Sequence, residues 1–253
     1  GGVGQLSLAI GESELLSRAG DLGLSSHLNF IRRVLRPAVT ILRDERPLEV
    51  GQSRFGGIPD LPAGATWPTH DDGPYRFLGQ LNFTELPENR GFLPKTGLLS
   101  LFVADDPSGE SEYFWGDAGY ISAVWLPDSS TVEPIRSPFS DQEQPGTALS
   151  FRSTLDIPYD AEQVDDWPFD EAGSDAFRAL RTSLHASDDY LLGYPSHCSL
   201  AYDPTPPGSL PFLTLGSDES LDWCWHDGDK LMVFIDSDRL RAKDFSELLA
   251  DAG

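Results

Sequence analysis

Apolar residues recur at helical spacing in the first part of the chain and mostly at strand spacing after it. Between residues 11 and 35 the pattern predicts two short helices separated by a break at Gly20. Pro37 ends the second helix, because proline has no N–H to donate and restricts the residue before it. The apolar, β-branched run over residues 38–42 is the first expected strand.

Turn-forming residues dominate the chain from residue 51 to residue 74. Gly56 and Gly57 allow a backbone conformation that other residues avoid, and the prolines of this stretch exclude a helix. We therefore expect an ordered, extended excursion here. A strand is expected over residues 77–83, which alternate between two faces. Another is expected over residues 98–103, where apolar residues on both faces predict a central strand.

The second half of the chain mixes the same two kinds of pattern. An acidic stretch rich in Ser, Pro, Asp and Gln comes first. Residues 174–184 then predict an amphipathic helix, with Phe177, Leu180, Arg181 and Leu184 at helical spacing. The other expected elements are a strand within residues 148–155, strands around Leu213 and over residues 231–235, and a C-terminal helix over residues 243–250.

Composition favours a β-rich protein. The chain of 253 residues is long enough to bury a large core, and its 24 Gly and 20 Pro favour short strands joined by tight turns. We therefore predict the α+β class, with mainly antiparallel sheet and with helices at the N-terminus, in the middle and at the C-terminus.

Two short echoes in the sequence indicate an internal duplication. Trp115-Gly116-Asp117 and Trp225-His226-Asp227 each precede turn residues and a strand. A competing alignment pairs Leu99, Phe102, Val103 and Asp106 with Leu231, Phe234, Ile235 and Asp238. Both alignments predict an N-terminal helical segment, residues 1–36, followed by one duplicated domain, residues 37–253. The pseudo-repeats are expected at residues 37–127 and 185–253, and an acidic segment, residues 128–184, connects them.

Charge is strongly negative and unevenly distributed. The chain has 41 Asp and Glu against 18 Lys and Arg, a formal net charge of −23, and only Arg136 and Arg152 are basic between Leu101 and Asp175. Such a field repels phosphate backbones and anionic lipids, so we expect neither nucleic-acid nor membrane binding. The acidic stretch is interpreted as a solvated face, as a docking surface for a basic protein partner or, least favoured, as a cation site.

The sequence carries few signs of compartment. No apolar run approaches the ~20 residues that span a bilayer, and no signal peptide is visible. Cys198 and Cys224 are too few for a disulfide framework and are expected to be ordinary buried thiols. These features indicate a cytoplasmic protein.

Several short signatures, each weak alone, are specific together. They are Gly56-Gly57-Ile58-Pro59-Asp60-Leu61-Pro62, Trp67-Pro68, Phe77-Leu78-Gly79-Gln80-Leu81, Leu98-Leu99-Ser100-Leu101-Phe102, Leu191-Leu192-Gly193-Tyr194-Pro195, Trp225-His226-Asp227 and Asp244-Phe245-Ser246. In this combination, over roughly residues 40 to 250, the chain resembles the YwqG-like family, also catalogued as DUF1963, a domain of unknown function. The resemblance implies an α+β fold dominated by antiparallel sheet with an internal duplication, and it implies no activity.

The chain departs from the family pattern in two places. Relatives often carry a glutamine shortly after the Leu-Gly-Tyr-Pro element, where this chain has Ser196-His197-Cys198-Ser199. They often carry another in the strand after Pro211, which here reads Phe212-Leu213-Thr214-Leu215-Gly216. Any function of those glutamines is therefore in doubt here.

Gln80 is the strongest polar candidate because it lies inside an apolar strand. A buried amide needs about three or four hydrogen-bond partners. Gln80 therefore either ties a neighbouring loop, such as the Gly56-Gly57 turn, to the sheet or contacts a ligand. A pocket between the pseudo-repeats would be walled by Trp67, Gln80, Trp115, Tyr194 and Trp225.

No pattern predicts catalytic residues or a cofactor. The chain lacks a Gly-x-Ser-x-Gly elbow and a phosphate-binding loop. His185, at the end of an expected helix, is the most defensible general base, although a histidine there is more often a helix cap.

Metal binding is not expected either. His197, Cys198, Cys224 and His226 lack the spacing of a zinc site. The aspartates of residues 227–229 and 236–238 do not fit an EF-hand loop and are expected to cap turns.

These observations favour a non-catalytic, cytoplasmic binding protein whose acidic surface engages a basic protein partner, in the manner of an immunity or adaptor protein. The alternative is a small-molecule-binding protein or hydrolase with its pocket between the pseudo-repeats.

Overall fold

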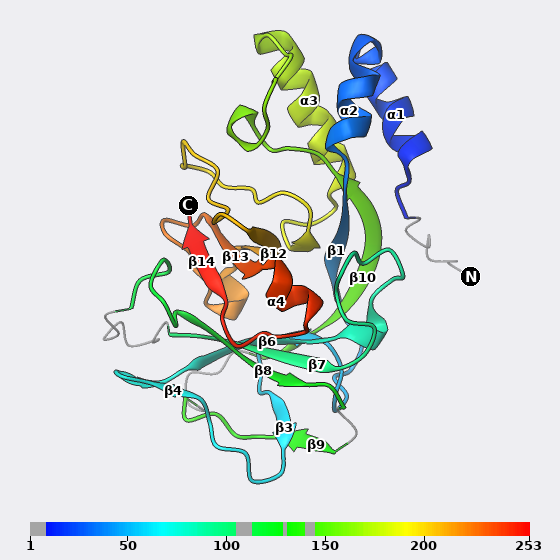
Figure 1. Cartoon of the computed structure of the whole chain (residues 1–253). Helices are drawn as coiled ribbons and strands as arrows, with labels where there is room; N and C mark the ends of the chain where they lie inside the picture. Colours follow the sequence, from blue (N-terminus) through cyan, green and yellow to red (C-terminus); the bar gives the residue numbers. More distant parts are fainter. Residues whose placement is uncertain (1–8, 105–112, 129–130, 140–144) are drawn as a thin grey trace, which may run out of the picture.

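A curled antiparallel sheet with a helical layer at one end makes up the fold (Figure 1). The computed structural model describes residues 9–104, 113–128, 131–139 and 145–253. The helices of this part are α1 (Glu12–Asp21), α2 (Leu28–Val34), α3 (Glu171–Leu184) and α4 (Ser237–Arg241). Within it, no helix is long and apolar enough to cross a bilayer.

Most strands of the described residues belong to one large sheet. Its order is β14-β13-β12-β11-β1-β10-β2-β6-β7-β8, and every neighbouring pair is antiparallel. The strands are β1 (Arg36–Asp44), β2 (Arg54–Phe55), β6 (Arg76–Asn82), β7 (Leu98–Val103), β8 (Ile121–Leu126), β10 (Thr147–Asp156), β11 (Tyr190–Leu192), β12 (Ser209–Gly216), β13 (Lys230–Asp236) and β14 (Leu249–Ala252). Small ribbons pair β3 (Asp60–Pro62) with β9 (Val132–Pro134), and β4 (Thr69–His70) with β5 (Gly73–Pro74).

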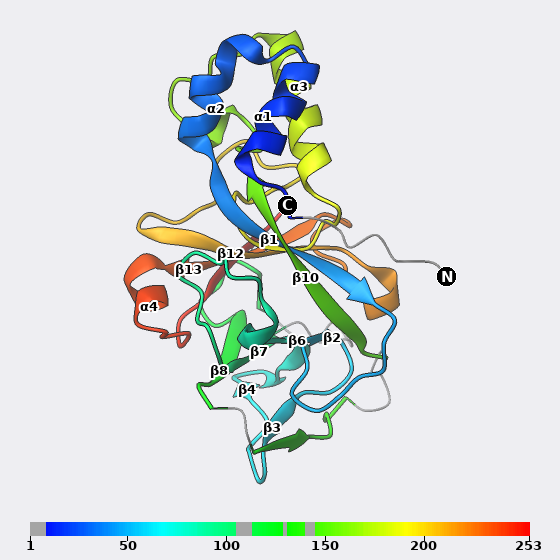
Figure 2. The same cartoon turned by 90° about the vertical axis from the view of Figure 1, so that its right-hand side faces the viewer.

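The long β1–β10 pair forms the centre of the sheet. It is in register from Arg36 opposite Asp156 to Asp44 opposite Ala148. The pair runs from the helical layer down into the curled part of the sheet (Figure 2). These two strands therefore connect the two parts of the molecule.

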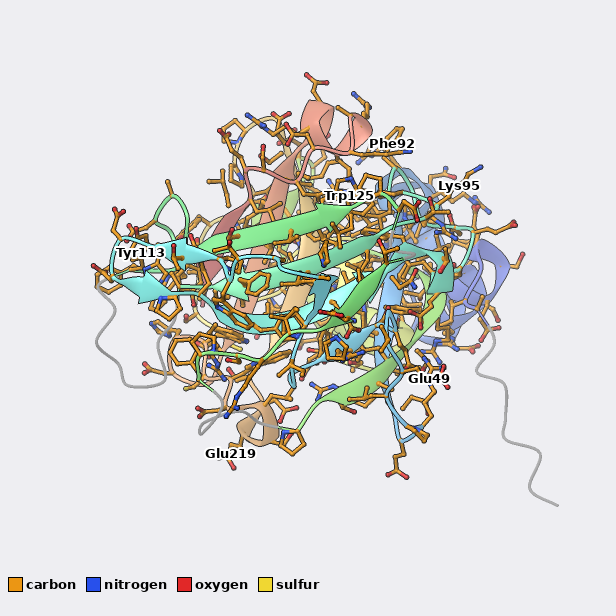
Figure 3. All side chains as sticks on the ribbon, turned by 90° about the horizontal axis from the view of Figure 1, so that it is seen from below. Glu49, Phe92, Lys95, Tyr113, Trp125 and Glu219 are labelled. Carbon is orange, nitrogen blue, oxygen red and sulfur yellow. The ribbon has the colours of Figure 1, made fainter. Side chains whose placement is uncertain are left out.

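The sheet curls until its two ends enclose a common hydrophobic core. Phe245, in the segment between α4 and β14, connects these ends. Its ring centre lies 5.0 Å from that of Trp125 on β8, 6.1 Å from that of Phe83 after β6 and 5.9 Å from that of Phe212 on β12. Figure 3 shows Trp125 on its strand from below. The result is a nearly closed, barrel-like sheet.

A second core lies in the helical layer, where α1, α2 and α3 meet. It is aromatic, with Phe30, Trp167, Phe169 and Phe177 in mutual ring contact. The predicted N-terminal helical segment, residues 1–36, thus shares a core with α3 of the connecting segment.

The predicted α+β class and the antiparallel sheet are confirmed. The pattern correctly located α3 and the strands β1, β6, β7, β10, β12 and β13. β8 follows Trp115-Gly116-Asp117 and its turn residues, where the repeat comparison expects a strand, whereas the short strand β11, whose sequence carries no distinct alternation, was missed. Asp106, part of one repeat alignment, lies outside the described residues.

The predicted C-terminal helix over residues 243–250 is wrong. The helix lies earlier, as α4, because Asp236 Oδ1 accepts the N–H groups of Asp238 and Arg239 and so caps its start. Lys243 then adopts a left-handed φ of 55°, which ends the helix. Residues 249–252 pair with β13 as β14 instead.

Phe245→Ala should lower the free energy of unfolding by about 3–5 kcal/mol, because it empties a fully packed aromatic site that joins the two ends of the sheet. Urea unfolding measures this loss. Phe114→Ala is the matched control, since Phe114 is 66% exposed. A loss below about 1 kcal/mol at Phe245 would contradict its role.

Candidate functional site

A buried carboxylate, Asp156, organises the corner between α3 and the sheet. It ends β10 and is fully buried. Its Oδ2 accepts the backbone N–H of Tyr194 at 2.7 Å and Nη2 of Arg181 at 3.2 Å. Its Oδ1 lies 2.8 Å from Nε2 of His185 and 3.1 Å from Nε of Arg181. One carboxylate therefore holds a strand end, a helix and a loop together.

Helix α3 brings Arg181 to this carboxylate. Asp170 caps the start of the helix by accepting the N–H of Gly173 at 2.8 Å. Arg181 lies on the same buried face as Phe177 and Leu184, at helical spacing, so its guanidinium points down onto the sheet. A charged side chain on an apolar face is stable only with such a partner.

Electrostatics keep this pair ionised. Burial alone would raise the pKa of Asp156, but Arg181, His185 and the N–H of Tyr194 outweigh it and lower that pKa to about 2. Burial alone would likewise lower the pKa of Arg181, but Asp156 and Tyr190 raise it above its usual value. Both groups are charged at any physiological pH.

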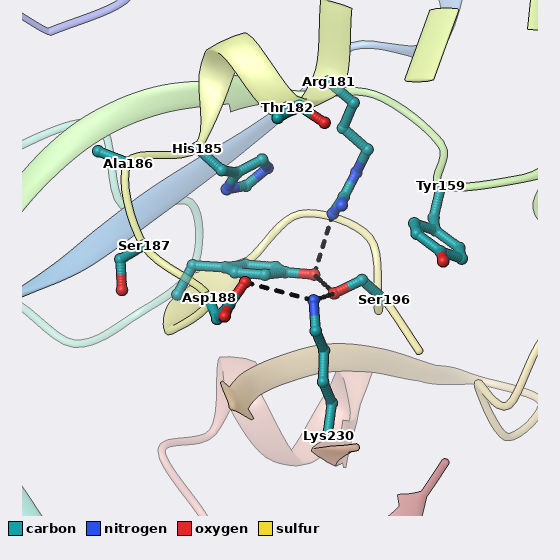
Figure 4. Close-up of a pocket in the computed structure, with 10 residues that line it drawn as sticks. Tyr159, Arg181, Thr182, His185, Ala186, Ser187, Asp188, Ser196 and Lys230 are labelled. Carbon is teal, nitrogen blue, oxygen red and sulfur yellow. Dashed lines mark hydrogen bonds and ion pairs between the residues drawn. The ribbon is translucent and has the colours of Figure 1, made fainter. Parts of the chain in front are cut away.

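A polar cavity of about 340 Å³ lies beside this ion pair. Its walls come from the loop after β10, the last turn of α3, the loop before β11, β11 itself, the loop after it and the start of β13 (Figure 4). The lining residues are Tyr159, Arg181, Thr182, His185, Ala186, Ser187, Asp188, Tyr190, Ser196 and Lys230. Hydroxyl and charged groups dominate it.

Lys230 is the second cation of this cavity. Its Nζ donates to Ser196 Oγ at 3.1 Å and lies 3.6 Å from Oδ1 of Asp188 (Figure 4). The Asp188 side chain is 76% exposed, so this ion pair is loose. Ser196 is fully buried, and its Oγ also lies 3.1 Å from the hydroxyl oxygen of Tyr190.

His185 leaves one polar atom unused at the cavity wall. Nε2 contacts Asp156, whereas the buried Nδ1 has no hydrogen-bond partner among the described residues. The side chain is only 9% exposed. An unpartnered buried nitrogen is unfavourable, and a bound molecule could satisfy it.

A second titratable cluster borders the cavity. Asp160 Oδ2 lies 3.4 Å from Nε2 of His197, whose ring contacts Tyr159. Burial and the neighbouring Glu162 raise the pKa of Asp160 to about 6, and burial lowers the pKa of His197.

Gln80, the leading polar candidate, is fully buried and tied to the protein itself. Its Oε1 accepts the N–H of Asp60 at 2.9 Å, and its Nε2 donates to Gln52 O and Asp60 Oδ2, both at 2.8 Å. These partners lie on either side of the Gly56-Gly57 turn. Gln80 thus fastens that excursion to β6.

The three predicted tryptophans lie in different surroundings. Trp67 Nε1 donates to Tyr75 O at 2.7 Å. Trp225 is buried, and its Nε1 donates to Gly216 O at 3.3 Å. Trp115 lies half-buried with its ring 5.7 Å from that of His226.

Tyr194 comes nearest to the polar cavity without lining it. Its carbonyl accepts Nη2 of Arg181 at 3.2 Å, and its hydroxyl donates to Val34 O at 2.7 Å. None of the five predicted residues is among those lining this cavity. That they share another pocket stays a prediction.

The residues of the cavity were largely missed from the sequence. His185 was singled out, but Ser196 and Lys230 carry no motif, because they meet only through the folding of distant segments. Arg181, a charge at apolar helical spacing, was the other available signal.

Metal binding finds no support in the described part of the chain, where no cluster of three or more His, Cys, Asp or Glu is placed for it. Cys198 and Cys224 are free and exposed, so the expectation of buried thiols is wrong. Both lie on loops between strands rather than in a core. Asp229 binds His226 Nδ1 at 2.9 Å, within a turn.

Asp156→Asn should lower the free energy of unfolding by about 3–5 kcal/mol near neutral pH, because it leaves buried Arg181 without its counter-ion. The folded pKa of about 2 lies below the ordinary value of 3.8, so the charge stabilises the fold above pH 3.8. This stability is lost as the pH falls through the folded pKa. Thermal unfolding across pH should thus show the wild-type advantage shrinking by about 2 kcal/mol between roughly pH 4 and 2.

Asp175→Asn is the matched control for this variant. Asp175 lies on the same helix, its side chain is 71% exposed, and it pairs with Arg178. It should change stability by less than about 0.5 kcal/mol. An Asp156→Asn deficit that does not vary over the acid range would contradict the ionised state.

Comparison with protein families places most of this architecture in one family. Residues 53–252 match a domain of unknown function, DUF1963. The match runs from β2 to β14 and includes every residue that lines the polar cavity. No curated protein matches the chain. The match covers more than half of the sequence, and the chain therefore belongs to the DUF1963 family.

Proposed function

We propose that the chain is a non-catalytic binding protein for a small polar molecule with an anionic group, held in the cavity beside Asp156. The observation that carries this is the lining itself. In a chain with a net charge of −23, Arg181 and Lys230 face the cavity together with one carboxylate, Asp188. Cations that face a polar cavity favour an anionic ligand, even though Asp156 and Asp188 balance their charge in the free protein.

The two cations have different roles in this proposal. Arg181 is held by Asp156 and by the carbonyl oxygens of Ile157 and Tyr194, so it forms a rigid wall. Among the described residues, Lys230 has only the exposed Asp188 as its counter-ion. A ligand anion therefore replaces Asp188 at Lys230, while the hydroxyls and His185 Nδ1 contact the rest of the molecule.

Hydrolysis, the other possibility for a pocket of this kind, has weaker support. Ser196 Oγ lies within reach of Lys230, as in a serine–lysine pair. Ser196 is, however, fully buried, and Nζ of Lys230 is also engaged by Asp188, whose Oδ1 lies 3.6 Å away.

We further propose that the sheet consists of two copies of one unit, as the family resemblance to YwqG-like proteins implies. The strand order is symmetric about β1–β10, with β2, β6, β7 and β8 on one side and β11, β12, β13 and β14 on the other. Both β6 and β12 have an irregular register, at Leu78 and at Phe212. In this comparison β7 corresponds to β13, which supports the alignment of Phe102 with Phe234.

Backbone geometry also supports the proposed duplication. Gly56 and Gly57 follow β2 with φ of 66° and 69°, and Leu192 and Gly193 at the end of β11 have φ of 61° and 68°. Two successive left-handed residues are rare, and a left-handed leucine is strained. A proline follows two residues later in both segments.

The two copies differ where the cavity lies. In the first copy, Arg54 Nη2 donates to Asp60 Oδ2 at 2.7 Å in a fully buried ion pair. The matching positions of the second copy are Tyr190 and Ser196, which line the cavity. Replacing an ion pair by a tyrosine and a serine leaves hydroxyls beside an open space.

The ligand proposal predicts opposite effects for two neighbouring substitutions. In thermal-shift titrations with inorganic phosphate and small hydroxy acids, Lys230→Met should abolish the shift. Asp188→Asn should strengthen binding by about threefold, because it removes the competing carboxylate. The measurement is the dependence of the melting temperature on ligand concentration.

Lys243→Met, an exposed lysine after α4, is the control and should bind as wild type. A wild-type melting temperature that no anion raises would sink the proposal. So would Lys230→Met binding like wild type.

Binding of a basic protein partner remains the second candidate, in a cytoplasmic setting. Between Asp160 and Asp175 the chain has seven acidic residues and no Lys or Arg. Six of them are exposed, on the loop before α3 and its first turns: Glu162, Asp165, Asp166, Asp170, Glu171 and Asp175. Such a surface would attract a basic partner electrostatically.

Pull-down with the full chain tests this candidate. A specific partner should be retained at low salt, released at high salt and lost with the triple variant Asp165→Asn, Asp166→Asn, Glu171→Gln. Neutralising Asp117, Asp227 and Asp238 on other surfaces gives the matched control. Equal retention by both variants would contradict this surface.

A further inference from the structure

An apolar groove lies on another side of the sheet, at the start of β1. It has a volume of about 260 Å³ and shares no residue with the polar cavity. Its apolar walls are Pro37, Phe92, Leu192, Leu210, Pro211 and Leu240. These residues come from β1, the loop before β7, β11, β12 and α4.

Phe92 forms the outer wall of this groove and is 57% exposed. It lies beside α4 (Figure 3), where the guanidinium of Arg241 is 4.8 Å from its ring centre. The ring therefore stands at the edge of the groove as an exposed apolar wall. An apolar molecule in the groove would cover the ring.

Arg36 lines the groove and gives it a charge. Its Nη1 donates to Gly193 O at 3.3 Å, and its guanidinium lies 3.7 Å above the ring centre of Tyr194. Within the residues that the structure describes, no carboxylate pairs with Arg36, although the chain has 41 acidic residues. Arg36 therefore presents an uncompensated cation beside an apolar surface.

The proposed duplication gives a reason why the groove beside β12 is open, because the matching place beside β6 is covered by a loop. Arg76 starts β6, and its Nη2 donates to the carbonyl oxygens of Leu221 and Asp222, both at 2.8 Å, which closes the corresponding corner. In the proposed duplication, Leu210 matches Arg76. Leu210 lies two residues before the irregular position of β12, and Arg76 lies two residues before the irregular position of β6. The side chain of Leu210 has no N–H to donate to backbone carbonyl oxygens. It therefore cannot hold a loop over the groove as Arg76 holds residues 221 and 222.

We propose that this groove binds a small apolar carboxylate, with its hydrocarbon chain along Leu210 and Leu240 and its carboxylate at Arg36. Each buried methylene strengthens the binding of such a molecule by about fourfold. A guanidinium binds a carboxylate through paired N–H groups. The remote negative charge of the chain has little effect, because charges beyond about 8 Å are screened at physiological salt.

Isothermal titration of the full chain tests the ligand class with three probes. Octanoate has both the chain and the carboxylate, octanol has only the chain, and acetate has only the carboxylate. Octanoate should bind most tightly, octanol about threefold more weakly, and acetate not measurably. Equal affinity for octanoate and acetate, or no binding of octanoate, would overturn the proposal.

Substitutions locate the site. Arg36→Gln should remove the preference for octanoate over octanol, whereas Arg178→Gln, an exposed arginine on α3, should keep it. Leu210→Arg fills the groove and should abolish binding of both. Phe92→Ala removes an exposed wall without disturbing the core and should weaken both.

These results are distinguishable from those for the polar cavity. Lys230→Met should leave octanoate binding unchanged. Octanoate that binds Leu210→Arg and Phe92→Ala as it binds wild type would place the molecule elsewhere and refute the groove.

Discussion

The Asp156–Arg181 ion pair is the interaction on which the rest of the structure depends. It joins the end of β10 to α3 and, through the N–H of Tyr194, to the loop that follows β11. Two buried charges are tolerated only when each is paired and hydrogen-bonded, and here both carboxylate oxygens are used. Because the pair is rigid, it fixes the spacing between helix and sheet, and the polar cavity lies in the space left beside it.

The β1–β10 pair is the second constraint, because it belongs to both hydrophobic cores. Val39 and Ile41 contribute to the core inside the curled sheet, whereas Leu155 and Ile157, at and just past the end of β10, pack in the helical layer. The helices are therefore anchored by the same strands that centre the barrel. The Asp156–Arg181 ion pair lies at the end of β10, between the two hydrophobic cores. A change in packing at this point would therefore affect both cores.

Local patterns predicted those parts of the fold whose residues interact along the chain. Helix α3 and strands β6, β7 and β13 follow from periodicity, since burial on one or two faces leaves a direct trace in the sequence. The C-terminal end could not be predicted in this way. Residues 243–250 have apolar positions that fit a helix, but the capping of α4 by Asp236 and the free edge of β13 determine the outcome. Tertiary pairing overrides weak local preference there.

The candidate site was harder to predict for the same reason. Tyr159, Arg181, Ser196 and Lys230 are far apart in sequence, and no spacing between them is fixed until the sheet forms. The family signatures pointed elsewhere, to glycines, prolines and tryptophans that shape turns. Two cavity residues stood out: His185 as a candidate base at a helix end, and Arg181 as a charge on an apolar helix face. A charge in such a place must have a buried partner, and that partner marked the corner where the cavity lies.

Arginine use explains how an acidic chain keeps cations at these corners. Several arginines bind backbone carbonyl oxygens: Arg46 binds Leu149 O in addition to Glu85, Arg54 binds Glu49 O in addition to Asp60, and Arg90 binds Phe83 O. Each such arginine joins a loop to a strand or to another loop. Guanidinium groups therefore lie inside loop corners of a chain whose net charge is −23. In the proposals above, an anion would therefore meet a cation locally, Lys230 in the polar cavity or Arg36 in the apolar groove, although the chain as a whole is acidic.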